Sequence, residues 1–106
     1  MPRLEYSERF VSDLALIESP RLEARILLDL DNIEMFGEFG SSNIPQSIRE
    51  QFGDGVRKVA VNPFDLIYTY YPEQDLVHIE ALVHQRAAWE PRGHRVPAFL
   101  FDGRCQ

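Results

Sequence analysis

The chain of 106 residues has a single cysteine, Cys105, and therefore cannot form a disulfide bond within itself. This composition fits a reducing compartment, because disulfides persist mainly in oxidising ones. The first ten residues, MPRLEYSERF, carry charges throughout and contain no apolar run, so we expect no signal peptide. No segment approaches the roughly 20 consecutive apolar residues that a transmembrane helix needs. These absences favour a cytoplasmic protein that does not enter a membrane.

Motifs for several common chemistries are also missing from the sequence. It contains no glycine-rich phosphate loop after a strand, no HExxH motif and no nucleophile-elbow serine. His78 and His84 lie six residues apart in an expected strand, about 20 Å along it, which is too far to share one metal ion. We therefore expect no metal, no cofactor and no small-molecule substrate.

Basic residues are outnumbered, with 11 basic against 17 acidic side chains and a formal net charge of −6, and Lys58 is the only lysine. Broad binding to nucleic acid is driven by a basic face, and this balance argues against one. Hydrophobic residues make up 44% and charged residues 26%, which is ordinary for a globular protein. We expect one domain, since two would each be too small to bury a stable core.

The first half of the chain shows apolar residues at helical spacing. Ser7 and Ser19 can cap helices, Pro20 suits a first helical position, and Gly37 is a stop signal. Two helices joined by so short a connection should form an antiparallel hairpin. The expected elements are a strand at 3–6, a helix from 7 to about 18, a second helix from 20 to 36, a loop at 38–45 and a helical turn at 46–52.

After Gly55 the apolar period changes from 3.6 to 2, which predicts an antiparallel meander. Asn62–Pro63 and Pro72–Asp75 supply the turns. The expected strands are 56–61, 64–71 and 76–86. In the last strand one face is apolar and should pack on the helices, with Val77, Ile79, Ala81 and Val83. The other face is more polar and should remain exposed as a concave surface, with His78, Glu80, His84 and Arg86. The sequence thus predicts a two-layer α+β domain in the order β-α-α-β-β-β.

Two arginines at strand ends are candidates for anion binding. Arg57 opens one strand and Arg86 closes another, and in a three-stranded meander these ends can lie near each other. Arginine keeps its charge and can fork onto a phosphate or a carboxylate. His84, two residues before Arg86, titrates near neutral pH and could carry a proton. Taken alone, such residues are more often plain surface residues, and both interpretations stay open here.

This layout resembles the RelE/ParE family of bacterial toxins. Ser47–Arg86 is similar to the family's segment of an arginine-bearing strand, an aromatic strand and a final strand that ends in a VHxR motif, here Val83–Arg86. Tyr6–Ile17 resembles the family's first helix. The resemblance covers roughly residues 3–89, and the motifs within it are moderately specific in this order and weak alone.

The family divides by target, and the resemblance implies different roles in each branch. RelE-like members cleave mRNA within the ribosomal decoding site, whereas ParE-like members inhibit DNA gyrase. A nuclease of this family would use Arg57, Lys58 and Arg86 as its cations, with His84 carrying a proton. Asp65 stands where nuclease members typically carry an arginine, so a cation is replaced by an anion. The C-terminal tyrosine or histidine of those members has no clear counterpart here.

Together these observations predict a toxin domain at 1–89 and a C-terminal tail at 90–106. The resemblance implies a type II toxin–antitoxin module whose cognate antitoxin neutralises the toxin. The acidic balance and Asp65 favour the ParE-like branch, in which a host protein such as DNA gyrase is the target. The alternatives are a RelE-like, ribosome-dependent mRNA endonuclease and a detoxified relic that only binds its antitoxin.

Overall fold

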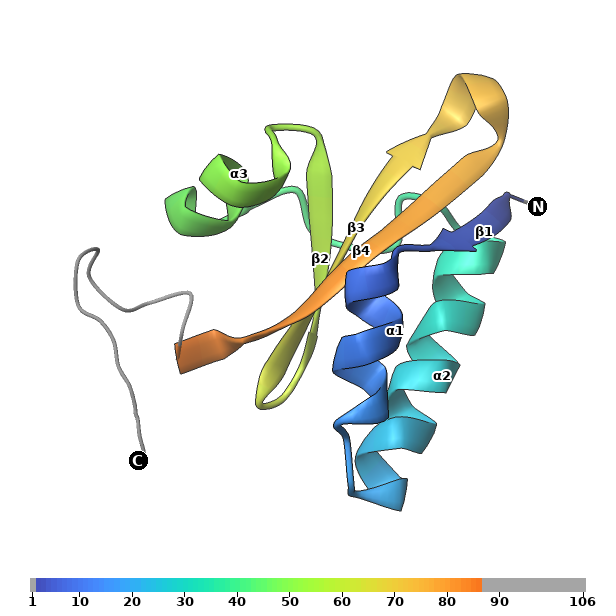
Figure 1. Ribbon diagram of the computed structural model, residues 1–106. Helices are drawn as coiled ribbons and strands as arrows, with labels where there is room; N and C mark the ends of the chain where they lie inside the picture. Colours follow the sequence, from blue (N-terminus) through green and yellow to red (C-terminus); the bar gives the residue numbers. More distant parts are fainter. Residues whose placement is uncertain (1, 87–106) are drawn as a thin grey trace.

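The computed structural model describes residues 2–86, which form a four-stranded mixed sheet and three α-helices. The strand order is β1-β4-β3-β2. Figure 1 shows α1 and α2 together on one side of the sheet and α3 apart from them. The elements are β1 (Arg3–Tyr6), α1 (Glu8–Ala15), α2 (Pro20–Met35), α3 (Gln46–Phe52), β2 (Val56–Val61), β3 (Phe64–Tyr71), the 3-10 helix η1 (Pro72–Gln74) and β4 (Leu76–His84).

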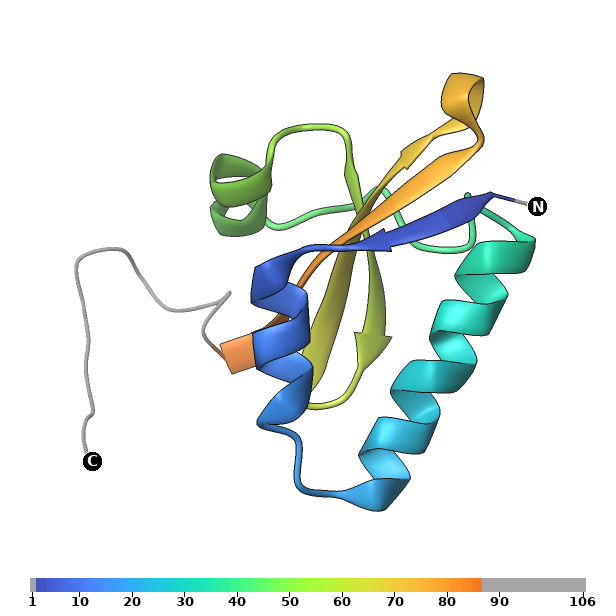
Figure 2. The same cartoon turned by 45° about the vertical axis from the view of Figure 1, so that its right-hand side comes forward.

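Local signals start both long helices where the sequence predicted. The Ser7 side chain accepts a hydrogen bond from the Phe10 amide, and Ser19 accepts one from Leu22, with Pro20 at the first helical position. Helix α1 ends at Ala15, earlier than the expected Glu18. The amides of Leu16 and Ile17 donate to the carbonyls three residues before them, as in a 3-10 turn, so the α-helical pattern stops there. Figure 2 shows α1 and α2 joined at one end and diverging towards the other, as an antiparallel hairpin.

The predicted meander is confirmed, with β2, β3 and β4 antiparallel, and β1 adds to β4 as a parallel edge strand. The prediction that the last strand reaches Arg86 is wrong, since β4 ends at His84 and the next two residues are helical. Phe64, the first residue of β3, is the ladder partner of His84. The residues before Phe64 form the turn at Asn62–Pro63, so the ladder between β3 and β4 cannot continue past His84. The Gln85 amide instead donates to the Pro63 carbonyl at 2.8 Å.

A β-bulge at Glu80 changes the direction of the side chains in β4. Ile79 pairs with Tyr68 and Ala81 pairs with Ile67, so Glu80 has no partner in the ladder. The expected single apolar face of Val77, Ile79, Ala81 and Val83 is therefore wrong. One extra residue shifts the alternation, and the two pairs of side chains enter different cores.

The sheet separates two groups of buried side chains. The larger core lies under α1 and α2 and includes Phe10, Ile26, Leu30, Ile33, Val61, Leu66, Tyr68, Val77, Ile79 and Leu82. The smaller core joins α3 and its preceding loop to the other face and includes Ile44, Ile48, Val56, Ile67, Ala81 and Val83. The predicted open concave face is thus partly wrong, because the segment around α3 covers the apolar part of it.

Helix α1 also completes the edge of β4 where β1 ends. The Ser7 amide donates to the Ile79 carbonyl at 3.0 Å, and Ser7 Oγ donates to the Glu80 carbonyl at 2.6 Å. Farther along, the Leu82 amide donates to Asp13 Oδ2 at 3.1 Å. These contacts satisfy backbone groups that would otherwise form an unpaired strand edge.

Candidate functional site on the sheet and beside α2

Arg57 and Lys58 are neighbours in β2, and their side chains therefore lie on opposite faces of the sheet. Arg57 pairs across the ladder with Tyr68, on the face that carries α1 and α2. Its Nη1 donates to the carbonyl of Gly40 at 2.8 Å and to that of Glu38 at 3.4 Å. Arg57 thus holds the loop after α2 against the edge of the sheet, and Nη1 of its guanidinium is already engaged by two backbone carbonyls.

Lys58 lies on the other face and forms an ion pair with Asp65. Its Nζ is 3.8 Å from Asp65 Oδ2, and the Asp65 side chain is only 3% exposed. Gln85 Nε2 donates to Asp65 Oδ1 at 3.2 Å. The position at which the sequence resemblance implied a lost arginine therefore holds a buried carboxylate, which neutralises the only lysine.

His84 and Arg86 lie at the end of β4 and are both exposed. The His84 ring meets the Phe64 ring edge-on, with centroids 5.3 Å apart. The Arg86 amide donates to His84 Nδ1 at 3.1 Å, which fixes the imidazole beside the backbone of the arginine. These two residues are brought together, as their spacing suggested.

The expectation that Arg57 and Arg86 meet is wrong. Strands β2 and β4 each run antiparallel to β3 and hence run in the same direction. The start of β2 therefore lies beside the start of β4, and Arg86 follows the opposite end. The row of Arg57 and Tyr68 lies four residue steps along β3 from the row of Phe64 and His84, which is about 13 Å. The four candidate residues do not form one site.

A polar cluster joins β1, β4 and β3. The sequence placed His78 and Glu80 on one face, but it did not predict their contacts with Glu5 and Thr69. His78 lies between two carboxylates, with Nδ1 at 3.7 Å from Glu5 and Nε2 at 3.7 Å from Glu80. Thr69 Oγ1 donates to Glu80 Oε2 at 2.9 Å. The cluster depends on the bulge, which directs Glu80 towards Thr69. Among residues 2–86, no three His, Cys, Asp or Glu side chains are placed to hold a metal ion.

Tyr68, the ladder partner of Arg57, is completely buried. Its hydroxyl accepts a hydrogen bond from the Gly40 amide at 2.7 Å and donates one to the Gly37 carbonyl at 2.9 Å. Burial raises the pKa of Tyr68 above its ordinary value, although the Gly40 bond and the charge of Arg57 partly oppose this. Burial, with help from Glu34 and Asp31 of α2, also raises the pKa of Tyr6. Tyr68 acts here as a structural hydrogen-bonding group that closes the loop after α2.

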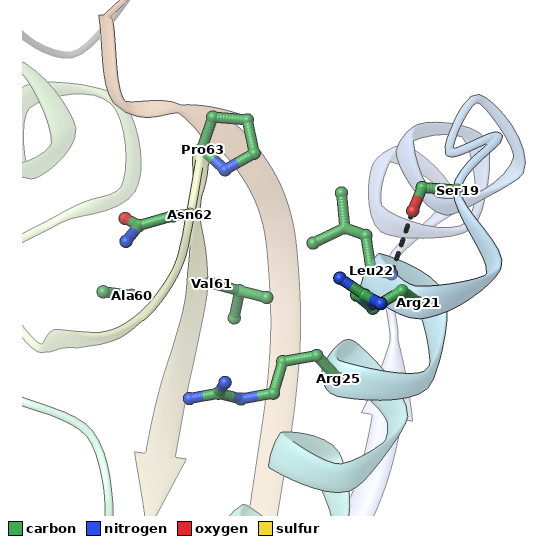
Figure 3. Close-up of a pocket in the computed structure, with 8 residues that line it drawn as sticks. All are labelled: Ser19, Arg21, Leu22, Arg25, Ala60, Val61, Asn62 and Pro63. Atoms are coloured by element: carbon green, nitrogen blue, oxygen red, sulfur yellow. Dashed lines mark hydrogen bonds between the residues drawn. The ribbon is translucent and has the colours of Figure 1, made fainter.

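A second candidate site lies between the first turns of α2 and the β2–β3 turn. This cleft of about 460 Å³ is lined by Ser19, Arg21, Leu22, Arg25, Ala60, Val61, Asn62 and Pro63 (Figure 3). Its two arginines were not singled out from the sequence, where they look like ordinary solvent-facing helix residues. The cleft could not be predicted from the sequence, because residues 60–63 on its other wall are far from Arg21 and Arg25 along the chain.

None of the helices within residues 2–86 has the length and apolar character needed to cross a membrane. The predicted tail at 90–106, together with residues 87–89, lies outside the described residues.

Comparison with solved structures identifies a protein of similar fold. No protein-family model matches the chain, and no curated protein matches it. A chain in the crystal structure of the intact E. coli RelBE toxin–antitoxin complex has a similar structure, with a TM-score of 0.60 and 11% sequence identity. The similarity covers 79% of this chain and 96% of that chain. The α+β fold predicted from the element order is confirmed, and the fold of this chain is RelE-like.

Proposed function

We propose that this chain is the growth-inhibiting toxin of a type II toxin–antitoxin module and acts on a host protein, with DNA gyrase as the first candidate. A cognate antitoxin keeps it silent. The RelE-like fold supports the toxin role, because the similar structure comes from a toxin–antitoxin complex. Large apolar side chains that are more than half exposed on α2 and just after it support a protein partner that covers them: Leu28, Met35 and Phe36.

The ion pair of Lys58 with Asp65 is the observation that most favours a protein target over mRNA. Attack of a 2′-hydroxyl on phosphate builds negative charge that free cations must stabilise. Here the lysine faces a buried carboxylate 3.8 Å away, and Arg57 is bonded to two loop carbonyls. Arg86 lies at the far end of the sheet from Arg57. Cations that are dispersed and partly neutralised are poorly suited to phosphate chemistry.

One observation favours the alternative, a ribosome-dependent mRNA endonuclease. His84 and Arg86 are adjacent and exposed, and the Arg86 amide holds His84 Nδ1 at 3.1 Å. Such a pair could deliver a proton and a positive charge to one phosphate. The exposed pair therefore remains the place to look for nuclease activity.

The deciding experiment is primer extension on cellular mRNA shortly after the chain is induced without any antitoxin. We expect growth arrest with intact transcripts. Cuts at codon positions that vanish when translation is blocked would establish the nuclease instead, and Arg86→Ala should then abolish them. Growth that continues unchanged in the natural host would contradict the toxin role and favour an antitoxin-binding relic.

A purified-protein assay tests the gyrase target separately. We expect the chain to inhibit DNA supercoiling by gyrase, and we expect Arg86→Ala to inhibit it equally. Unchanged supercoiling at stoichiometric excess would exclude gyrase while leaving other host proteins open. Co-expression with the product of the neighbouring reading frame should restore growth if that product is the antitoxin.

A further inference from the structure

The cleft beside α2 joins two positive charges to an apolar wall. Arg21 and Arg25 lie one helical turn apart and both line it, and both side chains are exposed. Figure 3 shows Arg25 reaching from α2 towards β2, while Leu22 and Val61 face each other between the two walls. Pro63 closes one end of this wall. A bound group would therefore meet guanidinium donors and aliphatic surface together.

Arg21, in the first turn of α2, is not where helix energetics would place a cation. Cations are unfavourable near a helix N-terminus, and like charges four residues apart repel each other. Arg21 makes no ion pair or hydrogen bond with any side chain among residues 2–86. The amide of Leu22 is already bonded to Ser19 Oγ, so the donors offered to the cleft are the guanidinium groups themselves.

A buried carboxylate holds Arg25 in place. Asp29, one turn along α2, has its Oδ2 at 3.5 Å from Arg25 Nε, and this oxygen accepts no hydrogen bond from the described residues. The contact uses the Nε side of the guanidinium and leaves the other nitrogens available. Asp29 therefore positions Arg25 before any ligand arrives, which reduces the entropy lost on binding.

We propose that this cleft binds a glutamate or aspartate side chain of a partner protein, presented next to an aliphatic residue. Asp29 offsets one of the two guanidinium charges, which leaves one net positive charge for a carboxylate, and a guanidinium can fork onto the two carboxylate oxygens. The neighbouring aliphatic residue of the partner would pack against Leu22 and Pro63, since Val61 is itself buried in the core. A nucleic-acid strand fits less well, because it brings many phosphates towards a chain whose net charge is −6. The proposal is independent of whether the chain acts on gyrase or on mRNA.

The test is a titration of the ¹⁵N-labelled full chain, followed by NMR of the amides and the arginine Nε–H groups. The probe is an acetylated, amidated peptide in which one glutamate lies between two leucines. We expect saturable shifts of Arg21, Arg25 and Leu22 at millimolar concentrations. The same peptide with glutamine in place of glutamate should produce no saturable shift there.

Variants separate the cleft from general charge effects. Arg21→Gln should weaken the peptide about tenfold, since it removes one charge-assisted contact and breaks no contact of the fold. Arg3→Gln, which removes an exposed arginine of β1 outside the cleft, should leave binding unchanged. Arg25→Lys should retain part of the affinity and keep the charge beside Asp29.

Three results would overturn the proposal. One is the absence of saturable shifts at these two arginines in a folded chain. Another is equal weakening by Arg21→Gln and Arg3→Gln, which would indicate only long-range charge. The third is tighter, Arg21-dependent binding of a single-stranded RNA oligonucleotide or of inorganic phosphate, which would assign the cleft to phosphate groups.

Discussion

Lys58 on β2 and Asp65 on β3 form an ion pair on the same face of the sheet, with Nζ 3.8 Å from Oδ2. The carboxylate is almost completely buried, whereas about a quarter of the lysine side chain is exposed. A buried charge without a partner is strongly unfavourable, so Lys58 compensates Asp65. The lysine that the family resemblance suggested as a catalytic cation therefore has a clear structural role.

This pair gives the first stability prediction. Lys58→Met should lower the free energy of unfolding by about 1–3 kcal/mol, because the carboxylate loses its cation while it stays buried. Urea denaturation followed by circular dichroism measures the change. The double variant Lys58→Met with Asp65→Leu should recover most of the loss, since replacing both partners by apolar groups removes the uncompensated charge. A single variant as stable as the parent would show that solvent screens Asp65.

The two helix-capping serines allow a matched comparison. Ser7→Ala should be more destabilising than Ser19→Ala, by about 1 kcal/mol, because Ser7 Oγ also donates to the Glu80 carbonyl. Both variants lose one cap bond to the helix backbone, so the difference isolates the link between α1 and β4. Thermal unfolding of the two proteins under the same conditions gives the comparison. Equal losses would mean that water replaces the bond to Glu80.

Two glycines should respond in opposite ways to alanine. A Cβ at Gly40 would lie 2.8 Å from a ring carbon of buried Tyr68 and 2.9 Å from the Lys58 carbonyl oxygen, so Gly40→Ala should cost about 1–3 kcal/mol. A Cβ at Gly55 meets nothing within 4 Å, and Gly55→Ala should be neutral or slightly stabilising. Denaturant midpoints distinguish the two. A neutral Gly40→Ala would mean that the loop after α2 can move away from β2.

The buried phenol predicts a decline of stability in alkali. Because the pKa of Tyr68 is higher in the folded chain, its stabilising effect is complete below the ordinary value of 10.0. Above that pH the unfolded chain loses the proton first, so the free energy of unfolding falls until the pH passes the raised pKa.

Tyr68→Phe removes this contribution, and its stability should fall less steeply between pH 10 and the raised pKa. Tyr6, whose pKa is also raised, remains in both proteins and serves as the internal background. At neutral pH the variant should be less stable by about 1–3 kcal/mol, because the Gly40 amide and the Gly37 carbonyl lose their partner. Identical pH slopes for the two proteins would contradict the role given to the phenol.

The sequence was most informative where local chemistry decides the structure. Ser7, Ser19 and Pro20 start the helices at the predicted residues, and the change of apolar period marks β2 and β3 correctly. The order of elements was then enough to indicate the RelE-like fold.

Long-range contacts explain what the sequence could not predict. The alternation from Val77 to Val83 suits a regular strand, and the bulge at Glu80 is recognisable only with Ser7 and Thr69 in contact with that residue. The expected meeting of Arg57 and Arg86 failed for a topological reason. In a three-stranded meander the outer strands run in the same direction, so a start and an end cannot lie side by side.

The extra residue at Glu80 divides β4 into two segments of opposite phase. A deletion of Glu80 would restore a regular ladder and leave Leu82 facing the long helices and Ala81 and Val83 facing α3, because Ile79 already pairs with Tyr68 and Ala81 with Ile67. The deletion would instead remove the bond from Ser7 Oγ to the Glu80 carbonyl and the bond from Thr69 to the Glu80 carboxylate. At this point β4 should thus tolerate the loss of one residue without repacking either core, and the cost should fall on the junction of α1 with β4 and on the contact between Glu80 and Thr69.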